Sequence, residues 1–314
     1  MSDFLFSLNA TMPVFILILL GWCLGKIGML TEEFTNVSNK FVFKIALPLM
    51  LFKDIASADI HDVFDIRFVL FCMISTTISF FGIWGGARIF LKDRSLTGAF
   101  VQGSFRGSAA ILGVAFIQNM YGNSGMAPLM IIGAVPLFNI YSVIVLTMES
   151  KEQNGNGIKN ACFNILKNPI ILGIIAGMIG SMLHIYQNLP VIIDKPLTNL
   201  SSLASPMALL AIGAGFETGK ALEKVKPAIW ATCIKLIGLP AIFMPVAIAL
   251  GFRGHDLIAF LIMLGAPTTV TSYIMAVNMK NDGVLSSSIV VLSTLLSSVT
   301  LTLWIYMLRV WNFI

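Results

Sequence analysis

The stretch GAPTT at residues 265–269 lies inside an apolar run that extends from residue 257 to residue 279. Proline has no backbone N–H and its ring clashes with the preceding helical turn, so a helix in this run is expected to break at Pro267. Inside a membrane, backbone groups freed by a break are tolerated only where they are buried in protein or line a cavity. The stretch therefore predicts an interrupted membrane helix beside a cavity.

Apolar runs of this kind fill most of the chain. Of the 314 residues, 57% are hydrophobic and 11% are charged, and the mean hydropathy is +0.90. A membrane-spanning helix needs about 20 apolar residues. The sequence therefore predicts an all-α integral membrane protein embedded in the lipid bilayer by ten helices. The ten predicted spans are residues 6–29, 37–56, 68–90, 96–120, 127–148, 169–187, 197–218, 227–252, 257–279 and 284–308.

Basic residues are distributed unevenly between the two sides of these spans. The loops after spans 1, 3, 5, 7 and 9 hold 13 of the 20 Lys and Arg residues, the opposite side holds five, and two lie inside spans. Cytoplasmic loops carry the excess of basic residues in membrane proteins. A multi-pass protein of the cell membrane with both termini extracytoplasmic is predicted. Topology then explains the net charge of +5, and no nucleic-acid partner is expected.

The two halves of the chain, residues 1–148 and 169–314, match at a nearly constant offset. Pro48 in the second span and Pro206 in the seventh, for example, are 158 residues apart. Because each half has five spans, the second half enters the membrane from the opposite side, so the repeat is inverted. Residues 149–168 are predicted to be the cytoplasmic loop that connects the halves.

A second cluster of small residues interrupts the fourth span, in the first half of the chain. Residues 103–108 read GSFRGS, and Gly107 corresponds to Pro267 at an offset of 160. Paired breaks in inverted halves are typical of the substrate sites of secondary transporters, although small residues also allow close helix packing. We favour a binding site. The candidate substrate-binding residues at the two breaks are Gly103, Arg106, Gly107, Ser108, Ala266, Pro267, Thr268, Thr269 and Ser272.

Two cations inside the predicted spans indicate the sign of the cargo. Arg106 lies roughly 15 Å into its span, close to the midplane, where an arginine costs at least about 2.5 kcal/mol. Its guanidinium suits a carboxylate, and the alternative is a structural ion pair or a cap on freed carbonyls. Lys235 in the eighth span is a further candidate for binding substrate, although its long stem is able to reach the interface. Helix N-termini at the breaks also favour an anion.

The acidic residues do not indicate a coupling ion. None of the fifteen lies at the middle of a span, which disfavours a proton antiporter built on a buried carboxylate. Sodium could still be bound by backbone carbonyls and by the hydroxyls of Thr268, Thr269, Thr271 and Ser272. The sequence leaves open whether a proton or sodium drives transport.

Catalysis is not expected from the motifs in the chain. Its three histidines lie at the extracytoplasmic ends of spans, and neither H-E-x-x-H nor G-x-S-x-G occurs. No enzyme activity, cofactor or metal centre is therefore predicted. A channel is a less favoured alternative, since nothing in the sequence indicates a repeated selectivity filter.

Four motifs, spread over most of the chain, resemble the auxin efflux carrier family. They are NKFVFKIALPLMLF at 39–52, QNMYG at 118–122, APTTVTSYIMAVNMKNDG at 266–283 and VLSTLLSSVTL at 291–301. That family includes plant PIN auxin exporters and bacterial carriers of malonate, malate and related organic acids. The resemblance implies a fold like that of the bile-acid symporters and sodium/proton antiporters, with elevator-type alternating access.

In such a fold, helices 1, 2, 6 and 7 form a scaffold through which homodimers assemble. Helices 3–5 and 8–10 form the mobile transport domain, whose broken helices 4 and 9 cross at the substrate. Plant members carry a proline at both breaks and asparagines in helix 4. Here Gly107 replaces the helix 4 proline, Ser108 replaces the asparagine after it, and Gly103 replaces the earlier one. These departures disfavour auxin. The expected cargo is a small mono- or dicarboxylate such as malonate or malate, with another small, even neutral, organic solute as the alternative.

Overall fold

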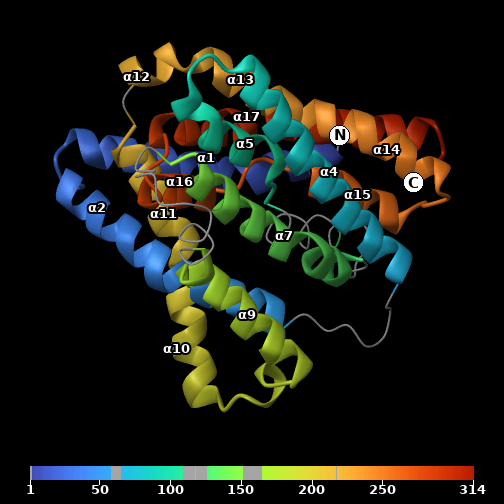
Figure 1. The fold of residues 1–314 in the computed structure, drawn as a ribbon, viewed down its shortest axis with the longest axis horizontal. Helices are drawn as coiled ribbons and strands as arrows, with labels where there is room; N and C mark the ends of the chain where they lie inside the picture. Colours follow the sequence, from blue (N-terminus) through green and yellow to red (C-terminus); the bar gives the residue numbers. More distant parts are fainter. Residues whose placement is uncertain (1, 58–64, 109–116, 118–125, 151–164, 217) are drawn as a thin grey trace.

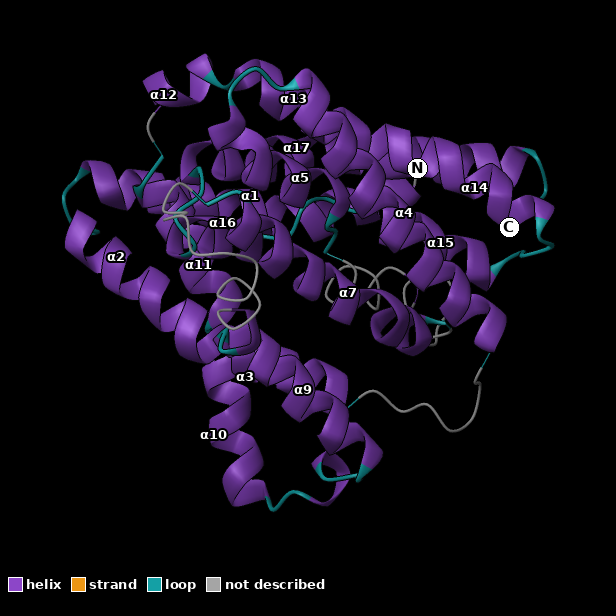
Figure 2. Cartoon of the chain, viewed as in Figure 1, coloured by secondary structure: helices purple, strands orange, loops and turns teal. Residues whose placement is uncertain are grey.

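The chain folds into helices joined by short connections (Figure 1), and the part of it that the structure describes contains no strand (Figure 2). This computed structural model describes residues 2–57, 65–108, 117, 126–150, 165–216 and 218–314. The first half contains α1 (Ser2–Lys26), α2 (Glu32–Phe41), η1 (Val42–Ala46), α3 (Leu47–Ala56), α4 (Ile66–Phe90), η2 (Arg94–Leu96), α5 (Thr97–Phe105) and α7 (Ala127–Met148). The second contains α9 (Pro169–Met182), η4 (Tyr186–Asn188), α10 (Val191–Ser202), α11 (Ala204–Ala214), α12 (Thr218–Glu223), α13 (Val225–Cys233), η5 (Ile234–Gly238), α14 (Leu239–Ala249), α15 (His255–Gly265), α16 (Thr271–Asn278) and α17 (Gly283–Val310).

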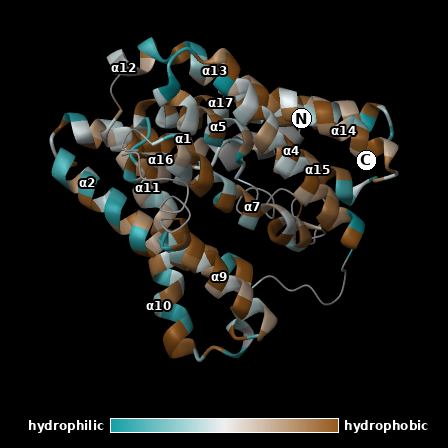
Figure 3. Cartoon of the chain, viewed as in Figure 1, coloured by the Kyte–Doolittle hydropathy of each residue, from teal (hydrophilic) through white to brown (hydrophobic). Residues whose placement is uncertain are grey.

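The helices have the length and surface expected of a membrane protein. Continuous helical stretches at 66–90, 127–148, 191–214, 225–249 and 283–310 are long and apolar enough to span a bilayer, and shorter apolar helices occur at 12–26, 169–182 and 255–265. Large apolar side chains point outward, as Phe81 and Ile242 do with 56% and 61% of their surface exposed. Figure 3 shows apolar residues over most helices and polar ones gathered on α2 and the connections.

Every predicted span contains at least one described helix, in the predicted order along the chain. The total of ten membrane crossings and the inverted repeat remain predictions. The end of the fourth span, the motif at 118–122 and most of the predicted connecting loop at 149–168 lie outside the described residues.

Two prolines inside long helical stretches are accommodated by wider turns. The π-helical turn η1 directly precedes Leu47 and Pro48, and η5 directly precedes Leu239 and Pro240. A π turn shifts the hydrogen-bonding pattern by one residue, which makes room for a ring that would clash with a regular α-helical turn. In η5 this turn carries Lys235, whose side chain is fully buried.

The most extensive helix contacts join α3 to α9 and α1 to α11. Small residues allow these helices to approach closely. At Gly213 of α11, an added Cβ atom would lie 2.0 Å from the carbonyl oxygen of Ile18 in α1. That distance is far below van der Waals contact, and the opposing atom belongs to the backbone, so a larger residue would force α1 and α11 apart.

Replacing Gly213 by alanine is therefore expected to lower stability, although alanine has the higher helix propensity by about 1 kcal/mol. Overpacking at such a contact costs about 1–3 kcal/mol, and the steric term should win because the backbone of α1 cannot rotate away. The melting temperature in detergent measures the effect. Gly85→Ala in α4 is the matched control, since a Cβ there meets no atom within 4 Å; equal melting of both variants would contradict this account of the contact.

Candidate functional site

The helical conformation ends at both predicted breaks, and the two breaks are in contact. Helix α5 ends at Phe105, and Arg106 is extended with φ −81° and ψ 127°. Helix α15 ends at Gly265, and helical structure resumes with α16 at Thr271. The backbone N–H of Ser108 donates to the carbonyl of Pro267 at 2.9 Å. Two segments about 160 residues apart therefore share backbone hydrogen bonding.

A threonine side chain makes a second connection between the breaks. The hydroxyl of Thr268 donates to the carbonyl oxygen of Gly103 at 2.6 Å, and its N–H donates to the hydroxyl of Ser293 in α17 at 3.1 Å. The end of α5 would otherwise leave the Gly103 carbonyl open, and the break of α15 would leave the Thr268 N–H open, so these bonds satisfy both groups. Thr268 and Gly103 thus link the two breaks.

Lys235 caps the C-terminal ends of both broken helices. Its ammonium donates to the carbonyl oxygens of Phe105 at 3.4 Å, Met263 at 3.0 Å and Leu264 at 2.7 Å. These carbonyls belong to the last turns of α5 and α15, where they have no helical partner and where the helix dipole is negative. A Cβ on Gly107 would lie 2.8 Å from the Lys235 nitrogen, so a glycine there leaves room for the cap.

Arg106 is held by neutral groups on two other helices. Its Nη2 donates to Asn139 Oδ1 in α7 at 2.8 Å and to Thr271 Oγ1 in α16 at 2.9 Å, and its Nη1 contacts the sulfur of Met275. Asn139 is fixed in turn by a 2.9 Å bond from its Nδ2 to the Val135 carbonyl. Arg106 is 3% exposed and forms no ion pair with a described carboxylate. The orientation of its guanidinium is therefore fixed by neutral groups.

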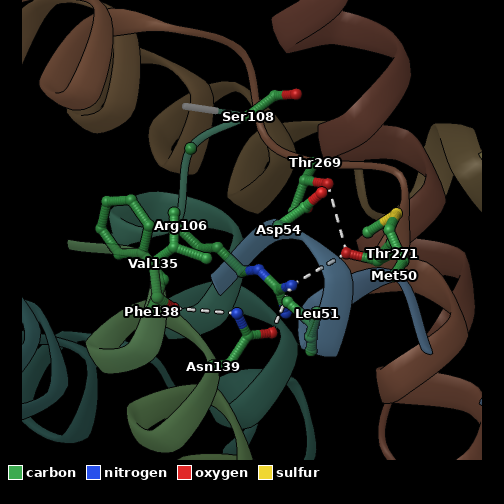
Figure 4. A pocket seen from close by; sticks show the side chains of 11 residues that line it. Met50, Leu51, Asp54, Arg106, Ser108, Val135, Phe138, Asn139, Thr269 and Thr271 are labelled. Atoms are coloured by element: carbon green, nitrogen blue, oxygen red, sulfur yellow. Dashed lines mark hydrogen bonds between the residues drawn. The ribbon is translucent and has the colours of Figure 1, made fainter. Parts of the chain in front are cut away.

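A pocket of about 40 Å³ opens beside Arg106 (Figure 4). Residues of α3, α7, the segment after α5 and the break between α15 and α16 form its wall. Four predicted substrate-binding residues border it, namely Arg106, Gly107, Ser108 and Thr269. The others do not: Gly103 lies in α5, Ser272 lies in α16, and Ala266, Pro267 and Thr268 lie in the break between α15 and α16, while Lys235 is engaged with the helix ends. Seven residues outside the predicted substrate-binding set also border the pocket: Met50, Leu51, Asp54, Val135, Phe138, Asn139 and Thr271.

Two of these additional residues, Asn139 and Asp54, bring an amide and a carboxylate to the pocket. Asn139 is a buried amide inside an apolar span, and a polar residue at that depth is itself a signal of function that could have been read from the sequence. Asp54 lies in the last turn of α3, and a position so close to the end of a span did not predict contact with the pocket.

The hydroxyls expected to bind sodium are partly engaged with protein groups. Thr268 donates to Gly103, Thr271 accepts from Arg106, and Thr269 and Thr271 lie 3.2 Å apart. The buried hydroxyl of Ser272 has no hydrogen-bond partner among the described residues. Within the same part of the chain, no group of three His, Cys, Asp or Glu side chains is arranged to hold a metal ion.

Comparison with known proteins places the chain in a family. The family described as "Membrane transport protein" matches residues 6–305. A protein of Methanothermobacter thermautotrophicus named "Uncharacterized transporter" is 25% identical over 96% of this chain and 98% of its own length. The "Uncharacterized transporter YfdV" of Escherichia coli (strain K12) is 25% identical over 97% and 98%. A Rhizobium meliloti protein named "Putative malonate transporter" is 22% identical over 95% and 94%.

Proposed function

Because the chain belongs to the family of membrane transport proteins that includes the auxin efflux carriers, we propose that it is a secondary transporter of a small organic anion. The cargo is a mono- or dicarboxylate such as malonate or malate, which crosses the cell membrane by alternating access. The observation that carries this proposal is the guanidinium of Arg106, which is buried at the pocket and pairs with no described carboxylate.

A carboxylate is the ligand that this arrangement suits best. The planar fork of a guanidinium matches the two oxygens of a carboxylate, and a buried guanidinium that no carboxylate contacts directly gains most from binding an anion. The amide of Asn139 and the hydroxyl of Thr271 already fix the plane of the fork. Thr271 also begins α16, so the positive end of that helix dipole lies at the pocket.

The pocket is smaller than a bound organic acid requires. Its volume of about 40 Å³ is far below the roughly 150 Å³ of a protein cavity that binds a molecule as small as benzene. We therefore expect the pocket to widen when the substrate enters. Its wall suggests how, because α3 belongs to the predicted scaffold, while α7, α16 and Arg106 belong to the predicted transport domain. Sliding of one body against the other changes both the width of the pocket and its exposure.

The helix contacts support the inverted arrangement that an elevator of this type needs. If the halves correspond at the observed offset, α1 corresponds to α9 and α3 corresponds to α11. The contacts of α1 with α11 and of α9 with α3 are then the same contact seen from the two halves, and they are the most extensive contacts between the described helices. We therefore propose that these helices form the scaffold and that two copies of the chain dimerise through it. We also propose that both termini are extracytoplasmic.

Uptake of radiolabelled malonate into proteoliposomes tests the proposal. We choose malonate as the probe because one relative is named "Putative malonate transporter". We expect saturable uptake and counterflow, inhibited by malate and other small carboxylates. Saturable transport of neutral or cationic solutes alone would contradict an anion carrier. Flux that rises linearly with concentration and shows no counterflow would indicate a channel.

A further inference from the structure

Asp54 places a carboxylate in the pocket that holds the Arg106 guanidinium. Met50, Leu51 and Asp54 lie on one face of α3 and together border the pocket (Figure 4). The carboxylate of Asp54 forms no hydrogen bond or ion pair with any described residue. A pocket for an organic anion therefore already contains a negative group of its own.

The other charged groups around α3 lie outside the pocket wall. Next to Asp54 on the same helix, the Lys53 ammonium donates to the hydroxyl of Thr198 in α10 at 3.0 Å. Asp194 of α10 accepts hydrogen bonds from Tyr186 and Thr198. Helix α9 contains no titratable side chain in its sequence.

The remaining titratable side chains on elements that contact α3 are Lys44 of η1, Lys195 of α10 and Tyr141 of α7. Among the described pocket residues, only Arg106 and Asp54 are charged.

The charges in the pocket balance only for certain states. In the empty pocket, the charges of Arg106 and an ionised Asp54 sum to zero. A bound monoanion would add a second negative charge in the same small space, and like charges that share a site favour the binding of a proton by one of them. If Asp54 takes up that proton, the loaded pocket is again neutral. Neutrality in both states matters for a site that moves through a membrane, where an uncompensated charge is expensive.

We propose that Asp54 binds one proton when an organic anion binds at Arg106, so that the carrier moves anion and proton together. This inference rests on the proposed function of the pocket. The proton enters from the solution on the side where the anion is bound and leaves Asp54 when the anion is released on the other side. A monoanion is then carried without net charge, and a dianion carries one negative charge. The alternating movement itself needs no sodium ion.

Proton uptake on binding can be measured directly on the wild-type carrier in detergent. Titration calorimetry with malonate, repeated in buffers of different ionisation enthalpy, gives the number of protons bound per anion. We expect close to one proton per anion, beyond any change in malonate's own protonation, at pH values where Asp54 is ionised in the empty carrier. In the same range the affinity should fall about tenfold per pH unit. This measurement does not depend on any variant folding.

The variant Asp54→Asn mimics the protonated carboxyl. We expect it to bind malonate more tightly than the wild type at high pH, with about one proton fewer taken up per anion. Because malonate's own ionisation is common to both proteins, the difference between them isolates residue 54. Asp194→Asn is the matched control, since Asp194 lies outside the pocket, and it should keep the wild-type proton uptake.

Three results would overturn the inference. The first is malonate binding with equal proton uptake in the wild type and Asp54→Asn, which would leave the anion carrier intact but exclude Asp54 as the coupling group. The second is loss of proton uptake in Asp194→Asn, which would place the titrating group outside the pocket. The third is binding of a zwitterionic amino acid in preference to malonate, which would make Asp54 a fixed partner of an ammonium group. A wild-type carrier that binds no anion would refute the proposed function as well, and that result is distinct from all three.

Discussion

Replacing Arg106 by glutamine should weaken malonate binding by roughly 30-fold to several thousand-fold. Removing one partner of a buried, hydrogen-bonded charge pair costs about 2–5 kcal/mol, which corresponds to that range of affinities. Glutamine can still donate to Asn139 or Thr271, so the local packing should survive while the charge is lost. Calorimetry of malonate binding and initial rates of uptake measure the effect.

Two further variants show whether the loss belongs to the guanidinium. Arg106→Lys keeps the charge but not the planar fork, and we expect it to bind malonate with intermediate affinity. Arg88→Gln is the control for loss of an arginine elsewhere, since Arg88 is exposed and pairs with Glu149 at 2.7 Å, away from the pocket. Wild-type affinity in Arg106→Gln, with an unchanged melting temperature, would show that the anion binds at another place.

Local chemistry explains why the breaks could be predicted from the sequence. Pro267 lacks an N–H and its ring excludes a regular turn whatever surrounds it, so the interruption of that helix depends on one residue and its neighbours. The same holds for the apolar spans, whose length is set by the thickness of the bilayer. The resemblance to auxin efflux carriers was likewise confirmed by the family match over residues 6–305.

The pocket wall depends on contacts between distant helices, and there the sequence was less informative. Asp54 lies at the end of a predicted span, but the folded chain places it in the wall of the same pocket as Arg106. Periodicity did not show that Lys235 is buried either, because η5 is a π turn rather than a regular α-helical turn. Asn139 is different, since a polar amide in the middle of an apolar span could have been predicted from the sequence to be a functional residue.

Replacing Lys235 by methionine should destabilise the protein by about 3 kcal/mol. The variant loses three hydrogen bonds and leaves the carbonyls of Phe105, Met263 and Leu264 buried without that donor. An unsatisfied buried polar group costs about 1–3 kcal/mol. Removing the cost of burying an ammonium offsets part of this loss. We expect the orphaned carbonyls to dominate, because they lie at the ends of both broken helices, α5 and α15.

A loss of about 3 kcal/mol should lower the melting temperature by about 4–5 °C for a protein of this size. Thermal unfolding in detergent, with and without malonate, is the measurement. Lys226→Met in α13 is the matched control, since it removes a lysine of the same region whose side chain is exposed. If Lys235 acts only as a cap, the fraction of Lys235→Met that stays folded after solubilisation should still bind malonate. Wild-type melting combined with lost binding would instead show that the Lys235 ammonium acts on the substrate and that the ends of α5 and α15 need no cation.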